Sequence, residues 1–201
     1  MQAVEGLVVS RTLAVVGVLL AALATANVAS AQPQARPVNE RGSADAPLTI
    51  VEYCTYDSET CSRLDIVLGG LLLDYAGRVR LVFHHVAADD TPEASLPYRA
   101  ALAAGVQGQF WPMHGLLMAN RQHATRAEIP KMAHQLGLDA ERFAADLDSA
   151  ETIAAAAQGR EAARAENIVA TPAVIVNGRV IAAVADAGDL RAVLQLALGP
   201  R

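Results

Sequence analysis

The chain has 201 residues, of which 53% are hydrophobic and 18% are charged, and its formal net charge at pH 7 is -5. This composition excludes intrinsic disorder for most of the chain and supplies enough apolar residues for the core of one domain. The negative charge and the lack of any run of Lys or Arg argue against a nucleic-acid groove. The two cysteines, Cys54 and Cys61, are too few for a disulfide-dense scaffold or an all-cysteine zinc site.

Residues 1–31 have the pattern of a secretory signal peptide. Arg11 precedes a charge-free segment with an apolar centre, and Ala29-Ser30-Ala31 supplies the small residues that signal peptidase requires. We therefore expect cleavage after Ala31 and a periplasmic or secreted protein. The alternatives are an uncleaved N-terminal membrane anchor, for which the uncharged segment is long enough, and a cytosolic chain that starts further along the sequence.

A polar leader and a buried strand follow. Residues 32–46 contain two prolines and are expected to form a flexible leader. The β-rich run 48–54 predicts a buried strand. Because side chains alternate along a strand, Glu52 and Cys54 are expected on the same face as Leu48.

A helix is expected to begin near Ser58 and to end at Gly77. Between these residues, apolar side chains recur at spacings of three and four and form one stripe, which includes Cys61 and Leu64. The run 79–83 predicts a second strand. Since a helix separates the two strands, we expect a parallel strand–helix–strand crossover.

The rest of the chain is expected to be a helical block, a hairpin and a closing helix. The pattern is helical from about residue 91 to residue 167. Two β-rich runs, 173–176 and 179–181, are joined by Asn177-Gly178, which is the strongest hairpin signal in the chain. Residues 189–198 predict the closing helix.

Three segments together resemble the DsbA-like branch of the thioredoxin-fold family. They are residues 42–53 (GSADAPLTIVEY), residues 109–114 (QFWPMH) and residues 170–178 (ATPAVIVNG). The resemblance covers about residues 42–200. It implies an α/β fold, namely a thioredoxin fold with an inserted helical domain.

The resemblance also implies domain boundaries and a site. The thioredoxin-like core is expected to comprise residues 47–90 and 168–201, and the helical insertion residues 91–167. The family has Cys-x-x-Cys at the start of its first helix, whereas this chain has Ser58-Glu59-Thr60-Cys61. The attacking cysteine is thus replaced by serine, and the second cysteine is kept. We therefore expect an exported thiol–disulfide oxidoreductase family protein with weakened or altered redox activity.

The residues of this motif have alternative roles. Ser58 is either the helix N-cap, accepting the N–H of Thr60 or Cys61, or a hydroxyl with a chemical role. Cys61 lies on the apolar stripe and is expected to be buried. Cys54 and Cys61 either form a disulfide or remain two free thiols, and a pairing between molecules is a third alternative.

Glu52, Thr171 and Pro172 complete the candidate site. Glu52 is either a proton relay for Cys61 or a buried acid that is satisfied by local hydrogen bonds. Thr171-Pro172 is expected to be a cis bond that exposes the preceding backbone to an extended peptide, with a simple turn as the alternative. His84 and His85 end a predicted strand and are expected to face the cleft.

The sequence is also compatible with two other functions. The first is a non-catalytic module that binds extended peptides beside Thr171-Pro172. The second is a glutathione-dependent transferase or isomerase that uses Ser58, because relatives of DsbA with that activity carry serine at this position. In the leading interpretation the partners are an extended peptide or a cysteine-containing protein substrate and a redox partner protein. We expect no cofactor, no metal and no nucleic acid.

Overall fold

The computed structural model describes residues 38–89, 91–181 and 187–198. The expected signal peptide or anchor, residues 1–31, and the first part of the leader lie outside the described residues. The elements, in chain order, are β1 (Glu40–Gly42), β2 (Leu48–Cys54), α1 (Glu59–Asp74), β3 (Val79–His85), α2 (Pro92–Val106), α3 (Phe110–Ala119), the 3-10 helix η1 (Arg121–His123), α4 (Ile129–Gln135), α5 (Ala140–Leu147), α6 (Ala150–Ala165), β4 (Ala173–Val176), β5 (Arg179–Ile181) and α7 (Ala187–Leu198).

The strands form one mixed sheet in the order β1-β3-β2-β4-β5. β2 and β3 are parallel, with Leu48 opposite Val79 and Cys54 opposite His85, so the predicted crossover through α1 is confirmed. β2 pairs antiparallel with β4, and β4 with β5. β1 lies in the segment expected to be a flexible leader, where it pairs antiparallel with β3 at the edge of the sheet.

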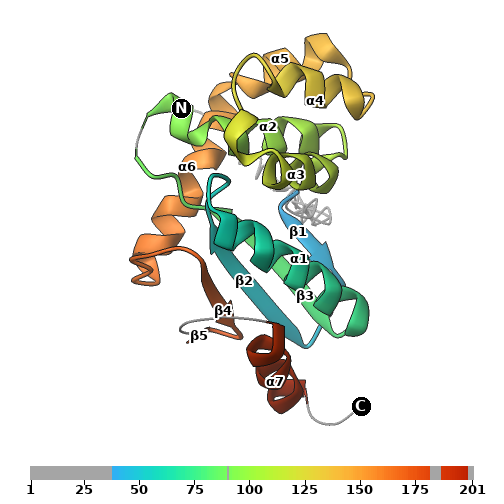
Figure 1. Cartoon of the computed structure of the whole chain (residues 1–201), viewed down its shortest axis with the longest axis vertical. Helices are drawn as coiled ribbons and strands as arrows, with labels where there is room; N and C mark the ends of the chain where they lie inside the picture. The colour runs from blue at the N-terminus through green and yellow to red at the C-terminus, as the bar shows by residue number, and fades with distance from the viewer. Residues whose placement is uncertain (1–37, 90, 182–186, 199–201) are drawn as a thin grey trace, which may run out of the picture. The chain divides into compact units, whose positions relative to one another are not determined.

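Helix α1 forms where the sequence predicted, because its ends carry the expected signals. Ser58 is its N-cap residue, and a helical turn later the apolar stripe begins with Cys61 and Leu64, both buried. Gly77 follows the helix with φ 77°, a left-handed conformation that glycine adopts without steric cost. In Figure 1 the helix runs across the face of the sheet between the end of β2 and the start of β3.

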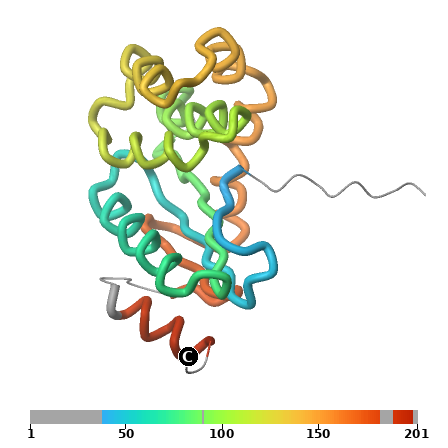
Figure 2. The backbone as a smooth tube through the Cα atoms, turned by 90° about the vertical axis from the view of Figure 1, so that its right-hand side faces the viewer, coloured from blue at the N-terminus to red at the C-terminus, as the bar shows by residue number. Residues whose placement is uncertain are grey.

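Helices α2 to α6 are inserted between β3 and β4. Figures 1 and 2 show α2 to α5 grouped beyond the end of the sheet at which β2 and β3 terminate, and α6 returning from this group toward β4. α6 makes a close contact with β3 on the way. A Cβ atom at Gly159 would lie 2.2 Å from the carbonyl oxygen of His85, so only glycine fits at this crossing. The insertion also contacts the loop that follows β2, because the hydroxyl group of Tyr56 lies 2.9 Å from Nδ1 of His114 on α3.

The chain closes with the predicted hairpin and helix. Asn177 and Gly178 both have positive φ, as a two-residue hairpin turn between β4 and β5 requires. Helix α7 contacts α1, and the Leu190 and Leu194 side chains of α7 are buried in the core. None of the helices in the described ranges has the length and hydropathy of a membrane span.

Candidate redox site

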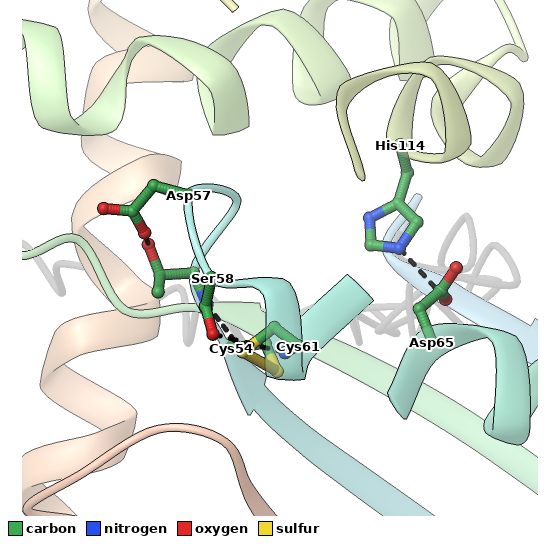
Figure 3. Close-up of a disulfide and its surroundings, with 7 residues drawn as sticks. Cys54, Asp57, Ser58, Cys61, Asp65 and His114 are labelled. Atoms are coloured by element: carbon green, nitrogen blue, oxygen red, sulfur yellow. Dashed lines mark hydrogen bonds and ion pairs between the residues drawn. A yellow bond between two sulfur atoms is a disulfide. The ribbon is translucent and has the colours of Figure 1, made fainter. Parts of the chain in front are cut away.

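Cys54 and Cys61 form a disulfide, with their Cα atoms 5.6 Å apart. Cys54 is the last residue of β2 and Cys61 lies in the first turn of α1, so the bond closes the loop of residues 55–60 (Figure 3). Of the alternatives that the sequence left open, two free thiols is therefore wrong. The interpretation as a degenerate S-x-x-C motif is corrected in the same way: the site holds a cysteine pair, because the end of β2 brings Cys54 to the start of the helix.

Both cysteines are completely buried, with an exposed fraction of 0%. The burial of Cys61 was predicted from its position on the apolar stripe. Ser58, at the start of α1, is half-buried. Its Oγ accepts a hydrogen bond from the backbone N–H of Cys61 over 3.2 Å, so the predicted capping role is confirmed.

The two sulfur atoms have different surroundings. The backbone N–H of Thr55 donates a hydrogen bond to Sγ of Cys61 over 3.4 Å. Cys61 also lies at the N-terminus of α1, where the helix dipole and the free N–H groups favour negative charge. A thiolate is therefore stabilised better on Cys61 than on Cys54.

Glu52 is fully buried on β2, two residues before Cys54. Neither of its carboxyl oxygens makes a hydrogen bond within the described residues. The alternative in which local hydrogen bonds satisfy the buried acid is therefore not observed. Burial raises the pKa of Glu52 well above its usual value, the charge of Asp65 raises it further, and Arg41 opposes both effects. Burial therefore favours the protonated form of Glu52.

Thr171 and Pro172 lie directly before β4, and the peptide bond between them is cis. Tyr53 of β2 is opposite Ala173 of β4, so the next position in each strand brings Pro172 beside Cys54. Val169, in the same loop, has an exposed fraction of 98%. The register of the sheet thus places the Thr171–Pro172 loop next to the disulfide.

A cleft of about 200 Å³ lies on another side of the disulfide loop. Thr55 and Asp57 of the loop line it, together with His85 at the end of β3 and Arg121 of η1. Burial lowers the pKa of His85 to about 4, against the effect of its hydrogen bond with the carbonyl group of Ala94. The imidazole of His85 is therefore neutral at pH 7.

Sequence reasoning missed a chain of polar side chains behind the loop, of which Tyr56 and His114 are buried and Asp65 and Arg41 are half-buried. Nδ1 of His114 is 2.9 Å from the hydroxyl group of Tyr56, and its Nε2 is 3.2 Å from Oδ1 of Asp65 (Figure 3 shows the second contact). Arg41 also donates to Oδ1 of Asp65, over 3.0 Å, and its guanidinium lies 4.1 Å from the ring centroid of Trp111. The one available signal was Asp65, an acid one helical turn after Cys61 beside the apolar stripe. We call Tyr56, His114, Asp65 and Arg41 the Tyr56 network.

Burial and the neighbouring charges shift the pKa values of His114 and Asp65 in the Tyr56 network. Burial lowers the pKa of His114, and the hydrogen bond and charge of Asp65 only partly offset this. Burial alone would raise the pKa of Asp65, but His114 and Arg41 outweigh it and lower that pKa. At neutral pH, Nε2–H of a neutral His114 therefore donates to the Asp65 carboxylate, and Nδ1 accepts from Tyr56.

The sequence matches the thioredoxin family over residues 36–195. The chain belongs to this family. Its fold is shared with a thioredoxin-like oxidoreductase from Silicibacter pomeroyi, which is 26% identical, with a TM-score of 0.70 over 81% of this chain and 92% of that one. A periplasmic thioredoxin-like protein from Salmonella enterica serovar Typhimurium is 24% identical, with a TM-score of 0.64 over 82% and 92% of the two chains.

A curated relative extends the comparison to a larger protein. The Na(+)/H(+) antiporter NhaA 3 of Salinispora tropica is 36% identical over 140 residues, which are 69% of this chain. The chain spans about a fifth of the length of that antiporter, as the matched part is 21% of it. The family match and the fold shared with the oxidoreductase from Silicibacter pomeroyi confirm the predicted thioredoxin fold, in which α2 to α6 are inserted between β3 and β4. Within the described ranges, no group of three or more His, Cys, Asp and Glu side chains is placed to hold a metal ion.

Proposed function

We propose that this protein is a thiol–disulfide oxidoreductase that works outside the cytoplasm and uses Cys54 and Cys61 as its redox pair. Its activity differs from the family pattern because Ser58 stands where the attacking cysteine is expected. The observation that carries the proposal is the disulfide between the end of β2 and the first turn of α1, beside the Thr171–Pro172 loop. The oxidoreductase from Silicibacter pomeroyi supports the reaction class.

The oxidised pair would accept electrons from a substrate dithiol. A substrate thiolate attacks Sγ of Cys54, the Cys54–Cys61 bond breaks, and Cys61 leaves as a thiolate. Cys61 is the better leaving group, because the Thr55 N–H and the helix N-terminus stabilise its charge. The second substrate thiolate then attacks the substrate sulfur of the mixed disulfide and releases Cys54. The substrate becomes a disulfide, and both cysteines are reduced.

Glu52 has the properties of a proton donor in this reaction. It is buried two residues before Cys54, burial raises its pKa, and its carboxyl group has no competing hydrogen bond within the described residues. A proton that moves from Glu52 to a cysteine thiolate would leave the negative charge on the Glu52 carboxylate, away from the sulfur atoms, where the charge of Arg41 favours it. Glu52 would take the proton back when the pair is oxidised again by a redox partner protein.

The proposed substrate is an extended peptide or a cysteine-containing protein that lies along the Thr171–Pro172 loop. Pro172 has no N–H group, so the backbone at Thr171 is left available to a bound strand. The exposed Val169 adds apolar surface next to it. A periplasmic or secreted location is supported by the disulfide, since such bonds persist in oxidising compartments, and by the periplasmic relative from Salmonella.

The burial of both cysteines favours a second candidate function. A disulfide with no exposed surface is typical of a structural bond, and the protein would then bind extended peptides at the Thr171–Pro172 loop without exchange. A glutathione-dependent transferase or isomerase that uses Ser58 is a third candidate. The Ser58 hydroxyl already accepts the Cys61 N–H, so its oxygen is engaged as a cap.

Oxidation of a reduced dithiol peptide separates these functions. Wild type, Cys54→Ser, Cys61→Ser and Ser58→Ala are incubated with the peptide, and peptide disulfide is quantified by mass spectrometry. The proposal predicts that wild type and Ser58→Ala oxidise one equivalent of peptide and that both cysteine variants oxidise none. An inactive wild type that still binds a cysteine-free peptide would support the binding module, and activity that requires glutathione and the Ser58 hydroxyl would support the transferase.

A further inference from the structure

The disulfide loop is held in place by one of its own side chains. Tyr56 is the buried residue among residues 55–60, and its ring packs in an aromatic cluster with Phe83 of β3 and His114 of α3. Its hydroxyl group bonds to Nδ1 of His114. Loop residues Asp57, Glu59 and Thr60 are exposed. Tyr56 is therefore the point at which the loop is attached to the inserted helices.

Charged side chains hold the histidine to which Tyr56 is bonded. Nε2 of His114 is fixed by the Asp65 carboxylate, which Arg41 also holds. Asp65 lies on α1, Arg41 is the middle residue of β1, and His114 lies on α3. The acceptor for the Tyr56 hydroxyl is thus oriented by two elements of the thioredoxin-like part and one of the insertion. The Tyr56 and His114 end of this connected set is buried and the Asp65 and Arg41 end is half-buried, so the hydrogen bonds hold the His114 ring in one orientation.

We propose that Tyr56, His114 and Asp65 position the loop of residues 55–60 over the disulfide and control how often the sulfur atoms are exposed to an attacking thiolate. Both cysteines have an exposed fraction of 0%, and the loop contacts Cys61 through the Thr55 N–H and the Ser58 hydroxyl group, so we expect an attack on either sulfur to require movement of the loop. Movement of the loop withdraws Tyr56 from His114. The hydrogen bond between these two residues is therefore part of the cost of opening.

The loop limits exposure of the disulfide whether or not the protein has a protein substrate. Where the proposed function is correct, the Tyr56 network sets the rate of exchange. Where the disulfide is structural, the same network protects it from reduction. The experiment therefore uses dithiothreitol, a small dithiol whose thiolate attacks one sulfur and whose second thiol closes a ring, leaving dithiothreitol oxidised and both cysteines reduced.

The rate of reduction is measured under native conditions by quenching with an alkylating reagent and counting alkylated cysteines by mass spectrometry. Tyr56→Phe keeps the ring and removes only the hydroxyl group, and it should accelerate reduction about fivefold, which corresponds to one hydrogen bond. Tyr98→Phe is the matched control, because it removes a hydroxyl group from a buried tyrosine of the same aromatic cluster that belongs to α2. It should leave the rate unchanged.

Two variants of His114 test whether the acceptor matters. His114→Leu should accelerate reduction about as much as Tyr56→Phe, and the double variant should be no faster than either single variant. His114→Asn places an amide oxygen near the position of Nδ1 and should restore much of the slow rate. Equal acceleration by Tyr56→Phe and Tyr98→Phe, or an unchanged rate in Tyr56→Phe, would overturn the inference. A wild type that is reduced slowly yet never oxidises peptide would contradict only the proposed function.

Discussion

The hydroxyl group of Ser58 accepts a hydrogen bond from the backbone N–H of Cys61, 3.2 Å away. Ser58 thereby caps the N-terminus of α1. The sulfur of Cys61 is bonded to Cys54 at the end of β2. The disulfide therefore joins the first turn of the helix to the end of the strand, while Ser58 serves as the helix cap.

A thiol at position 58 should rebuild the family's motif once Cys54 no longer competes for Cys61. We expect the double variant Ser58→Cys with Cys54→Ser to reduce insulin faster than wild type, measured by the turbidity of the precipitating insulin chains with dithiothreitol as electron donor. The N-terminus of α1 favours a thiolate at this position, although Glu59 beside it limits the gain. Ser58→Ala with Cys54→Ser is the control and should be inactive. No gain in the double variant would favour the binding module.

Loss of the Cys54–Cys61 bond should lower stability. The two cysteines are seven positions apart, and closing so short a loop stabilises the folded state by about 2.5 kcal/mol in the chain-entropy account. We expect urea denaturation to show a loss of about 2–3 kcal/mol on reduction of the wild type. The variant Cys54→Ala with Cys61→Ala should give the same free energy of unfolding with and without reductant. Equal stability of oxidised and reduced wild type would contradict this prediction.

Glu52 should make the wild type less stable as pH rises. Burial raises its pKa well above 4.5 in the folded protein, so above pH 4.5 the unfolded chain loses a proton that the folded protein keeps. Stability then falls with pH by up to about 1.4 kcal/mol per unit until the folded pKa is reached. Glu52→Gln carries no charge in either state. We expect its stability in urea, relative to wild type, to increase from pH 5 to pH 8.

The matched control for this pH dependence is Glu59→Gln. The Glu59 side chain is 65% exposed and pairs with Arg63 on the surface of α1, so its replacement should shift stability by little at every pH. Parallel stability curves for wild type and Glu52→Gln would show that the carboxyl group of Glu52 is not protonated in the folded protein.

Gly159→Ala should destabilise the contact between α6 and β3. The new methyl group would lie 2.2 Å from the carbonyl oxygen of His85, which is backbone and cannot move aside without shifting the strand. We expect a loss of about 1–3 kcal/mol in urea denaturation. Gly115→Ala, on α3, meets open space and should instead gain about 0.5–1 kcal/mol from better helix propensity. Similar effects of the two substitutions would be inconsistent with the close contact.

The sequence by itself determined the local elements of the fold. Residues 48–54 form a strand, Ser58 caps a helix, and Asn177-Gly178 turns a hairpin, all as predicted. The signals for these features are periodicity, capping side chains and turn residues, and each acts within a few positions of the chain. The resemblance of three segments added the order of core and insertion, which local signals do not contain.

Only the tertiary structure decided which side chains meet. Cys54 and Cys61 were left as a disulfide or two free thiols, because their separation depends on how the end of β2 meets the first turn of α1. Tyr56 and His114 are 58 positions apart, and they meet because the inserted helices pack against the end of the sheet. Spacing along a chain fixes the face on which a residue lies, whereas its partner is set by the register of the strands and the packing of helices on them.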